Sequence, residues 1–250
     1  MKGSTLFRQL PLKKILWASG LSVALISSAC SKKEQEDQAK ESANTEAPME
    51  ETTTTEWIDL PLSAWRNYHA DTLSPIWEEA EGVISLTGKG GGDIITQEKF
   101  ENFELSLEWK ISEGGNSGVF FRVVEADTLG AVYFSGPEMQ VLDNERHPDA
   151  QIDKHRAGDN YDLQACTEET VKPAGEWNQA RLIVNNGHVE HWLNGTKVVE
   201  YQIESPEWEE QLKNSKFTQW PAYGRNAVGH IALQDHGDQV WFRDIKIKRL

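Results

Sequence analysis

Polar side chains that can exchange protons alternate with apolar residues on three separate segments of the 250-residue chain. The segments are SGVFFRVV (117–124), PEMQVL (137–142) and HIALQDH (230–236). Because successive side chains of a β-strand point to opposite faces, the polar faces of these predicted strands carry Arg122, Glu138, Gln140, Gln234 and His236. A carboxylate, an imidazole, a guanidinium and two amides on one face could transfer a proton, stabilise an oxyanion and orient hydroxyl groups.

These groups form a site if the three strands lie in one sheet, with Gly118 and Phe120 as its floor. Concave surfaces with a few converging polar groups are a common form of ligand site. The alternative is that each group is a solvated residue on the wet face of a sheet. We favour the shared site, because the polar residues gather as a set and glycines stand at the segment ends.

Two neighbouring stretches add candidate residues. Asp143 follows the predicted Glu138 strand, at a loop end where specificity groups commonly lie. The loop HRAGDNYDL (155–163) offers His155 and Tyr161, although an Asx-type turn over residues 158–160 would also explain its composition. Trp220 lies among turn residues, where it is either a platform for a sugar or a hydrophobic plug.

The elements that must position these residues are strands with a period of two. In FELSLEWK (103–110) the apolar residues occupy every second position, as in an antiparallel strand with one wet face. Asn186-Gly187 and Asn194-Gly195 favour type I′ turns and predict a three-stranded meander over residues 180–203. The sequence therefore predicts an all-β fold, a β-sandwich of two antiparallel sheets.

Two local departures from this pattern are expected. The apolar positions change phase between Phe242 and Ile245, which predicts a β-bulge near Arg243-Asp244. SPEWEEQLKNS (205–215) predicts a short helix that begins with a Ser205 cap.

Charge and the N-terminal segment limit the partners of the chain. A net charge of -15 argues against nucleic-acid binding, which needs a basic surface. Residues 1–30 combine basic residues with an apolar run that ends at Cys30, which is typical of a lipoprotein signal peptide with Cys30 as the lipidated residue. The alternative is an ordinary cleaved signal. Residues 31–56 are almost free of apolar residues and predict a disordered linker, and residues 57–250 are predicted to form the folded domain.

Four motifs in this order resemble a bacterial family formerly known as domain of unknown function 1080. They are GGNSGVFFR (114–122), GPEMQVLDN (136–144), the stretch 172–201 and GHIALQDHGDQVWFRDIKIKRL (229–250). The family comprises 3-keto-glycoside lyases and hydratases, also called 3-keto-disaccharide hydrolases. The resemblance implies a concanavalin A-like lectin/glucanase jelly roll and a lipoprotein anchored in the periplasm or outer membrane of the cell envelope. The chain departs from the family in its GDNYDL loop, at Asp244 and at its entry into the domain.

The resemblance implies an elimination on a small-molecule substrate, a 3-keto-glycoside. A ketone at C3 acidifies the C2 proton, so a base can remove it while the glycosidic oxygen leaves C1. Hydration of the product then completes a net hydrolysis. As a hypothesis, Glu138 and His236 serve as base and acid, Arg122 and Gln140 stabilise the oxyanion, and Asp143 and Gln234 orient sugar hydroxyls. Asn116, His155 and Tyr161 complete the predicted substrate-binding set.

Three questions stay open from the sequence. A divalent metal held by Glu, Asp or His is an alternative electrophile to Arg122, although no metal-ligand spacing is diagnostic. An ordinary retaining β-glucanase would need a second carboxylate on the Glu138 face, where Leu142 stands instead. A lectin without catalytic activity would need the aromatic and hydrogen-bonding residues but no group with a shifted pKa.

Overall fold

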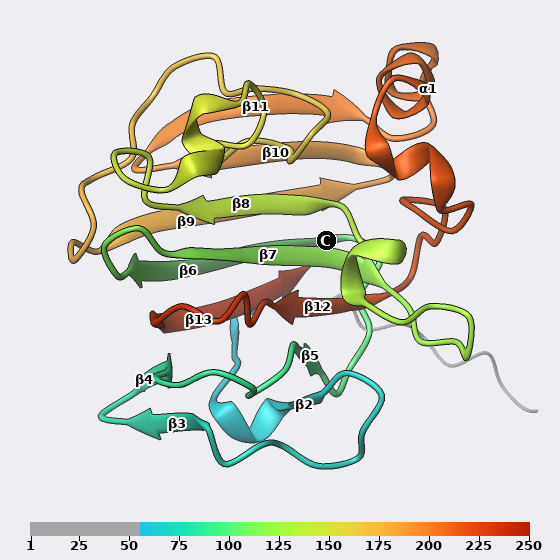
Figure 1. Cartoon of the computed structure of the whole chain (residues 1–250). Helices are drawn as coiled ribbons and strands as arrows, with labels where there is room; N and C mark the ends of the chain where they lie inside the picture. The colour runs from blue at the N-terminus through green and yellow to red at the C-terminus, as the bar shows by residue number, and fades with distance from the viewer. Residues whose placement is uncertain (1–55) are drawn as a thin grey trace, which may run out of the picture. The chain divides into compact units, whose positions relative to one another are not determined.

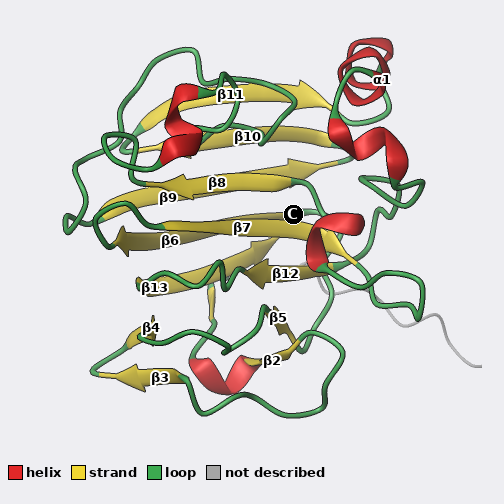
Figure 2. Ribbon diagram, viewed as in Figure 1, coloured by secondary structure: helices red, strands yellow, loops and turns green. Residues whose placement is uncertain are grey.

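The computed structural model describes residues 56–250, which form two antiparallel β-sheets (Figures 1 and 2). The first sheet has the order β11-β10-β9-β6-β13-β4-β3, and β1 pairs with β13. The second sheet has the order β2-β5-β12-β7-β8. The predicted β-sandwich of two antiparallel sheets is confirmed. Cys30 and most of the predicted 31–56 linker lie outside the described residues.

The strands of the first sheet are β1 (Ile58–Asp59), β3 (Trp77–Ala80), β4 (Val83–Leu86), β6 (Phe103–Ile111), β9 (Asn178–Asn185), β10 (His188–Leu193), β11 (Thr196–Gln202) and β13 (Val240–Arg249). The second sheet contains β2 (Trp65–Asn67), β5 (Ile94–Thr96), β7 (Asn116–Val123), β8 (Glu138–Leu142) and β12 (His230–Leu233). The helices are α1 (Pro206–Lys213) and the short 3-10 helices η1 (Leu62–Ala64), η2 (Val132–Phe134), η3 (Pro148–Gln151) and η4 (Lys216–Gln219).

The core lies between the two sheets and is filled by the alternate residues of their strands. In β6 every second side chain is buried, and Phe103, Leu105, Leu107 and Trp109 belong to one apolar cluster. Val119, Phe121, Met139, Ile231 and Leu233 enter the same cluster from the second sheet. Because these residues point into the core, the alternate residues of β7, β8 and β12 point to the outer face of the second sheet.

The predicted turns and the predicted bulge are present. Asn186 and Gly187 have φ angles of 49° and 79°, and Asn194 and Gly195 have 50° and 86°, so both hairpins use positive-φ turns. The β9-β10-β11 meander therefore matches its prediction. In β13 the register with β6 shifts between Arg243 and Lys246, and Asp244 has φ 50°, which confirms a bulge at this point.

The predicted helix α1 begins at Pro206, and the Ser205 hydroxyl accepts a hydrogen bond from the Trp208 N–H over 3.1 Å. This cap satisfies one of the free N–H groups of the first turn. We expect Ser205→Ala to lower the free energy of unfolding by about 1 kcal/mol, as measured by urea denaturation. Ser205→Thr keeps a capping hydroxyl and is the control. Equal stability of Ser205→Ala and wild type would contradict this assignment.

No helix within residues 56–250 combines the length and apolar character required to cross a lipid bilayer.

Candidate active site

The outer face of the second sheet contains a cavity of about 320 Å³. We call it the Glu138 pocket. Its lining residues are Asn116, Tyr133, Glu138, Gln140, Tyr161, Lys216, Phe217, Trp220, Gln234 and His236. The strands β12, β7 and β8 that form its floor are neighbours in the sheet (Figure 1). The structure thus brings together seven of the residues selected from the sequence: Asn116, Glu138, Gln140, Tyr161, Trp220, Gln234 and His236.

Strand register explains why these side chains meet. On β7 and β8, Gly118 pairs with Gln140 and Phe120 pairs with Glu138. On the other side of β7, the backbone N–H of Gln234 donates to the Gly118 carbonyl over 3.1 Å. The strands therefore place Gln140, Gly118 and Gln234 in one row across the sheet.

Glu138 lies in the floor of the pocket and is only 5% exposed. Its carboxyl group extends over the backbone of Gly118, where a Cβ atom would lie 2.1 Å from Oε1. Burial raises the pKa of Glu138 to about 8, nearby Lys216 opposes this rise, and Asp93 and Asp149 add to it. Glu138 can therefore exchange a proton near neutral pH, as a general acid or base must.

Amide groups and an imidazole surround the carboxyl group. Asn116, Gln140 and Gln234 line the pocket, and the buried Oδ1 atom of Asn116 has no hydrogen-bond partner among the described residues. His236 is exposed at the pocket, and its ring centroid lies 6.3 Å from that of His147. Such groups suit the hydroxyl groups of a sugar, which donate and accept hydrogen bonds.

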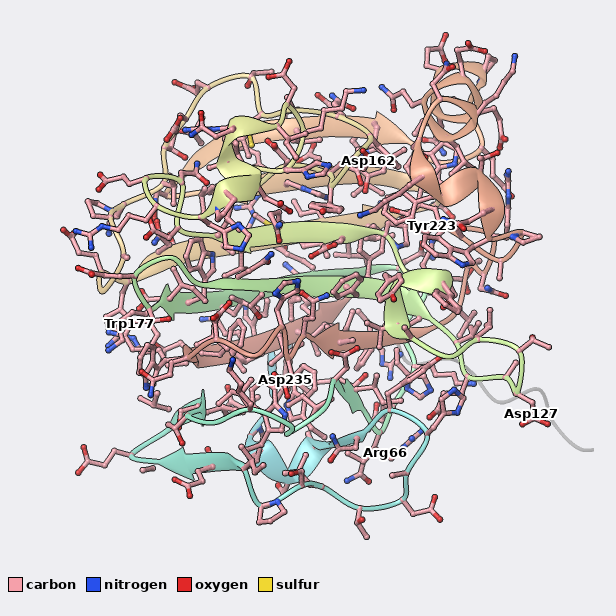
Figure 3. The ribbon with its side chains drawn as sticks, viewed as in Figure 1. Arg66, Asp127, Asp162, Trp177, Tyr223 and Asp235 are labelled. Carbon is pink, nitrogen blue, oxygen red and sulfur yellow. The ribbon has the colours of Figure 1, made fainter. Side chains whose placement is uncertain are left out.

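Four rings close the other side of the pocket, and we call Tyr133, Tyr161, Phe217 and Trp220 the aromatic wall. Trp220 stacks on Phe134 at 4.8 Å between centroids, and Tyr133 meets its edge at 5.4 Å. Phe217 stacks on the buried Tyr223 at 4.0 Å, which fixes the segment after α1 against the sheet. Figure 3 shows Tyr223 and Asp162 close to the start of β8, where Glu138 lies.

The loop over residues 155–163 supplies part of this wall. It pairs with the free edge of β8. The Tyr161 N–H donates to the Glu138 carbonyl over 3.1 Å, and the Gly158 N–H donates to the backbone carbonyl of Gln140 over 2.8 Å. The Tyr161 hydroxyl donates to Asp149 over 3.1 Å. The GDNYDL loop therefore extends the sheet by one edge and brings a ring to the Glu138 pocket.

Arg122 is not in the pocket, and the strand alternation assumed for it is wrong. Its φ angle is 57°, and the register between β12 and β7 shifts at this point. Its guanidinium Nη1 donates to the Gly224 carbonyl over 3.2 Å instead. The bulge also turns Val123 to the outer face, where it packs with Phe120. The sequence pattern fails here because a bulge reverses the faces of all later residues in a strand.

Asp143 and His155 are also outside the set that lines the pocket. The Asp143 carboxylate accepts the N–H groups of Gly114, over 2.6 Å, and Glu145, over 3.0 Å, so it stabilises two turns. The His155 ring lies behind Tyr161 at 4.2 Å between centroids, and its Nε2 is 3.2 Å from Asp162. His155 thus supports the aromatic wall from outside.

The sequence pattern missed Tyr133, Lys216 and Phe217, which line the pocket from segments outside the strands. Lys216 and Phe217 lie in η4, beside Trp220. The one available signal was the concentration of aromatic residues and a lysine in KFTQW (216–220).

A candidate metal cluster lies elsewhere. Among residues 56–250, His188, Glu190 and Glu200 are the group of three whose ligand atoms lie within 4.8 Å of one another. They belong to β10 and β11 of the first sheet, and Lys197 already forms ion pairs with both glutamates. The described lining of the Glu138 pocket contains a single carboxylate, so it does not form a comparable ligand set.

The chain is similar in sequence and in fold to proteins of known structure or activity. Over 218 residues the chain is 40% identical to a 3-keto-disaccharide hydrolase of Bacteroides thetaiotaomicron. The matched region covers 76% of this chain and 75% of that protein. The crystal structure of a candidate glycosyl hydrolase from Parabacteroides distasonis, at 1.70 Å resolution, is 32% identical with a TM-score of 0.71 and covers 76% of this chain and 90% of that chain. A second such structure from that organism is 27% identical with a TM-score of 0.60 and covers 78% and 100%.

The family model of the 3-keto-alpha-glucoside-1,2-lyase-like domain matches residues 57–248, which include every strand of the Glu138 pocket. The chain therefore belongs to the family of 3-keto-alpha-glucoside-1,2-lyase-like domains.

Proposed function

We propose that this protein cleaves 3-keto-glycosides by elimination, with Glu138 as the base that removes the proton from C2. The observation that carries this proposal is the buried carboxyl group over Gly118, in a pocket lined by amides and aromatic rings. Burial raises the pKa of Glu138 to about 8, a value suited to a general base near neutral pH. The relative from Bacteroides thetaiotaomicron is a 3-keto-disaccharide hydrolase, which supports the same substrate class.

In this mechanism Glu138 takes the C2 proton, and the electron pair of the C–H bond forms an enolate with the C3 ketone. The enolate then expels the glycosidic oxygen from C1, and His236, which lines the pocket, gives that oxygen a proton. Addition of water to C1 and return of a proton to C2 convert the unsaturated product into the free keto-sugar. Lyase and hydratase steps together amount to hydrolysis.

Two competing functions, a retaining glucanase and a lectin, fit this pocket less well. A retaining glucanase needs two carboxyl groups about 5–5.5 Å apart. Glu138 is the single carboxylate among the described residues that line the pocket. A lectin does not need a titrating group, whereas burial raises the pKa of Glu138, which lines the pocket.

Pairs of glucosides that differ only at C3 test the proposal. Purified protein is incubated with a native glucoside and with its 3-oxidised form, with and without a chelator, and the released aglycone is measured. We expect cleavage of the oxidised form alone, and the chelator arm determines whether a metal contributes. Equal cleavage of both forms would indicate a glucanase, and binding without cleavage would indicate a lectin.

Arg122 provides a further test of the site. We expect Arg122→Met to lower the free energy of unfolding by about 1–3 kcal/mol, because the Gly224 carbonyl loses its buried donor. Turnover of 3-oxidised glucosides by the folded variant should stay within a few-fold of wild type. Urea denaturation and initial rates measure the two effects. A large loss of turnover in a folded variant would return Arg122 to the catalytic set.

We also propose that the chain is a cell-envelope lipoprotein anchored through Cys30, because an apolar run with small residues precedes this cysteine. Growth of an expressing bacterium with a labelled fatty acid tests this point. Label in the wild type and its loss in Cys30→Ser are expected. Equal labelling of both proteins, or of neither, would contradict it.

A further inference from the structure

The elimination places negative charge on the ketone oxygen, and this charge needs a partner. Charge that develops in a water-poor site is best stabilised by a donor or cation already in position. Arg122, the cation predicted for this role, donates to Gly224 outside the pocket. The amides of Asn116, Gln140 and Gln234 are neutral.

Lys216 is the one lysine or arginine among the described residues that line the pocket, and the proton of His236 is used on the glycosidic oxygen. Its side chain lines the same cavity as Glu138, and its charge is the largest electrostatic influence that lowers the Glu138 pKa. Its Nζ atom lies 4.1 Å from the ring centroid of Tyr161 and 5.4 Å from that of Phe217. The ammonium group therefore lies over two rings of the aromatic wall, in the cavity that Glu138 also lines.

The backbone around Lys216 is fixed on both sides. The Lys216 N–H donates to the Asp162 carboxylate over 2.9 Å, and the neighbouring Phe217 stacks on the buried Tyr223 at 4.0 Å. Asp162 also accepts from His155, which supports Tyr161. The same network thus positions both the lysine and the ring beneath its ammonium group.

We propose that Lys216 is the electrophile of the elimination, with its ammonium group paired to the C3 oxygen of the bound keto-sugar. This inference rests on the proposed function. When the Glu138 carboxylate takes the C2 proton, the C–H electrons form the C2–C3 double bond and the carbonyl electrons move to the oxygen beside Lys216. When the C1–O bond breaks, those electrons return to the ketone, the former C–H pair becomes the C1–C2 double bond and the leaving oxygen takes up a proton.

Lys216→Met separates charge from packing, because methionine keeps an apolar stem over Tyr161 and Phe217 but carries no charge. We expect kcat on a 3-oxidised glucoside to fall about 10²- to 10³-fold, as on removal of a single oxyanion donor, with KM changed only a few-fold. Lys216→Arg restores a cation and should recover a substantial part of kcat. Lys213→Met is the matched control, because Lys213 pairs with Glu210 on the exposed face of α1, and it should behave as wild type.

A second readout distinguishes a charge effect from a structural effect. Removal of the Lys216 charge should move the pH at which kcat/KM rises to a higher value, because Lys216 lowers the pKa of Glu138. Unchanged kcat in Lys216→Met, or a loss that appears in KM alone, would overturn the proposal. If the wild type still cleaves only the oxidised glucoside, the Lys216 proposal alone is wrong and the proposed function stands. If the wild type does not cleave the oxidised glucoside, the proposed function is wrong as well.

Discussion

Glu138→Gln is expected to lower the turnover of 3-oxidised glucosides by about 10²- to 10⁴-fold, the usual contribution of a general base. The substitution keeps the size of the side chain over Gly118 but removes its ability to take a proton. KM should change little, because the amides and the aromatic wall still bind the sugar. Initial rates over a range of substrate concentrations separate the two parameters. Wild-type turnover in Glu138→Gln would remove Glu138 from the chemistry.

The pH dependence of the wild type follows from the same group. Burial raises the pKa of Glu138 to about 8, and the charged groups that act on it are Lys216, Asp93 and Asp149. Tyr133, Tyr161, Tyr223 and His236 are further titratable groups near it. Since the base must be deprotonated, kcat/KM should rise with pH, and the midpoint of this rise should lie near pH 8. The residual activity of Glu138→Gln should lack this rise.

Ionisation of the buried Glu138 should also lower the stability of the folded protein as the pH rises toward 8. Its pKa is about 8 in the folded protein against an ordinary value of 4.5, so between these values the folded state binds more protons than the unfolded chain. This contribution of Glu138 to stability therefore decreases as pH rises through that window. Glu138→Gln removes the cost of burying the charge, and its Tm relative to wild type should rise as pH increases from 5 to 8. A constant difference would contradict this account.

Gly118→Ala is expected to reduce turnover by about 10²-fold or more, because a small misplacement of a catalytic group has an effect of this size. The new Cβ atom would lie 2.1 Å from Glu138 Oε1 and 2.8 Å from Phe120 Cε2, so both side chains must move. Overpacking of this kind also costs about 1–3 kcal/mol of stability. Thermal denaturation shows whether the variant remains folded under the assay conditions.

Gly88→Ala is the matched control for Gly118→Ala. A Cβ atom at Gly88 would lie 3.5 Å from Ile76, which is an ordinary contact. This variant should keep wild-type turnover. If a folded Gly118→Ala also kept it, the position of the Glu138 carboxyl group over Gly118 would not matter for the reaction.

Local patterns were sufficient to predict most of the framework. The alternation in β6, the Asn-Gly turns of the meander and the phase change at Asp244 each depend on a few adjacent residues. It was harder to predict which strands are neighbours in the site, because β12 and β8 come from segments far apart in the chain. The parity of each strand nevertheless placed Glu138, Gln140 and Gln234 on the correct face.

Long-range contacts explain what the sequence pattern could not predict. Arg122 leaves the outer face because β7 bulges where it meets β12, with the Gly229 backbone directly against that of Arg122. Lys216 enters the pocket because Asp162 and Tyr223 fix a segment that has no strand periodicity of its own. Such contacts depend on packing between distant segments, so alternation within a strand contains no information about them.

The loss of the C2 proton is the central step of the proposed reaction, and isotopic substitution at C2 tests it most directly. A 3-oxidised glucoside that carries deuterium at C2 is compared with its unlabelled form in the rate of aglycone release. We predict slower release from the deuterated substrate and loss of the label to water. Equal rates with the deuterium fully retained at C2 would show a direct displacement at C1 and contradict the role of Glu138.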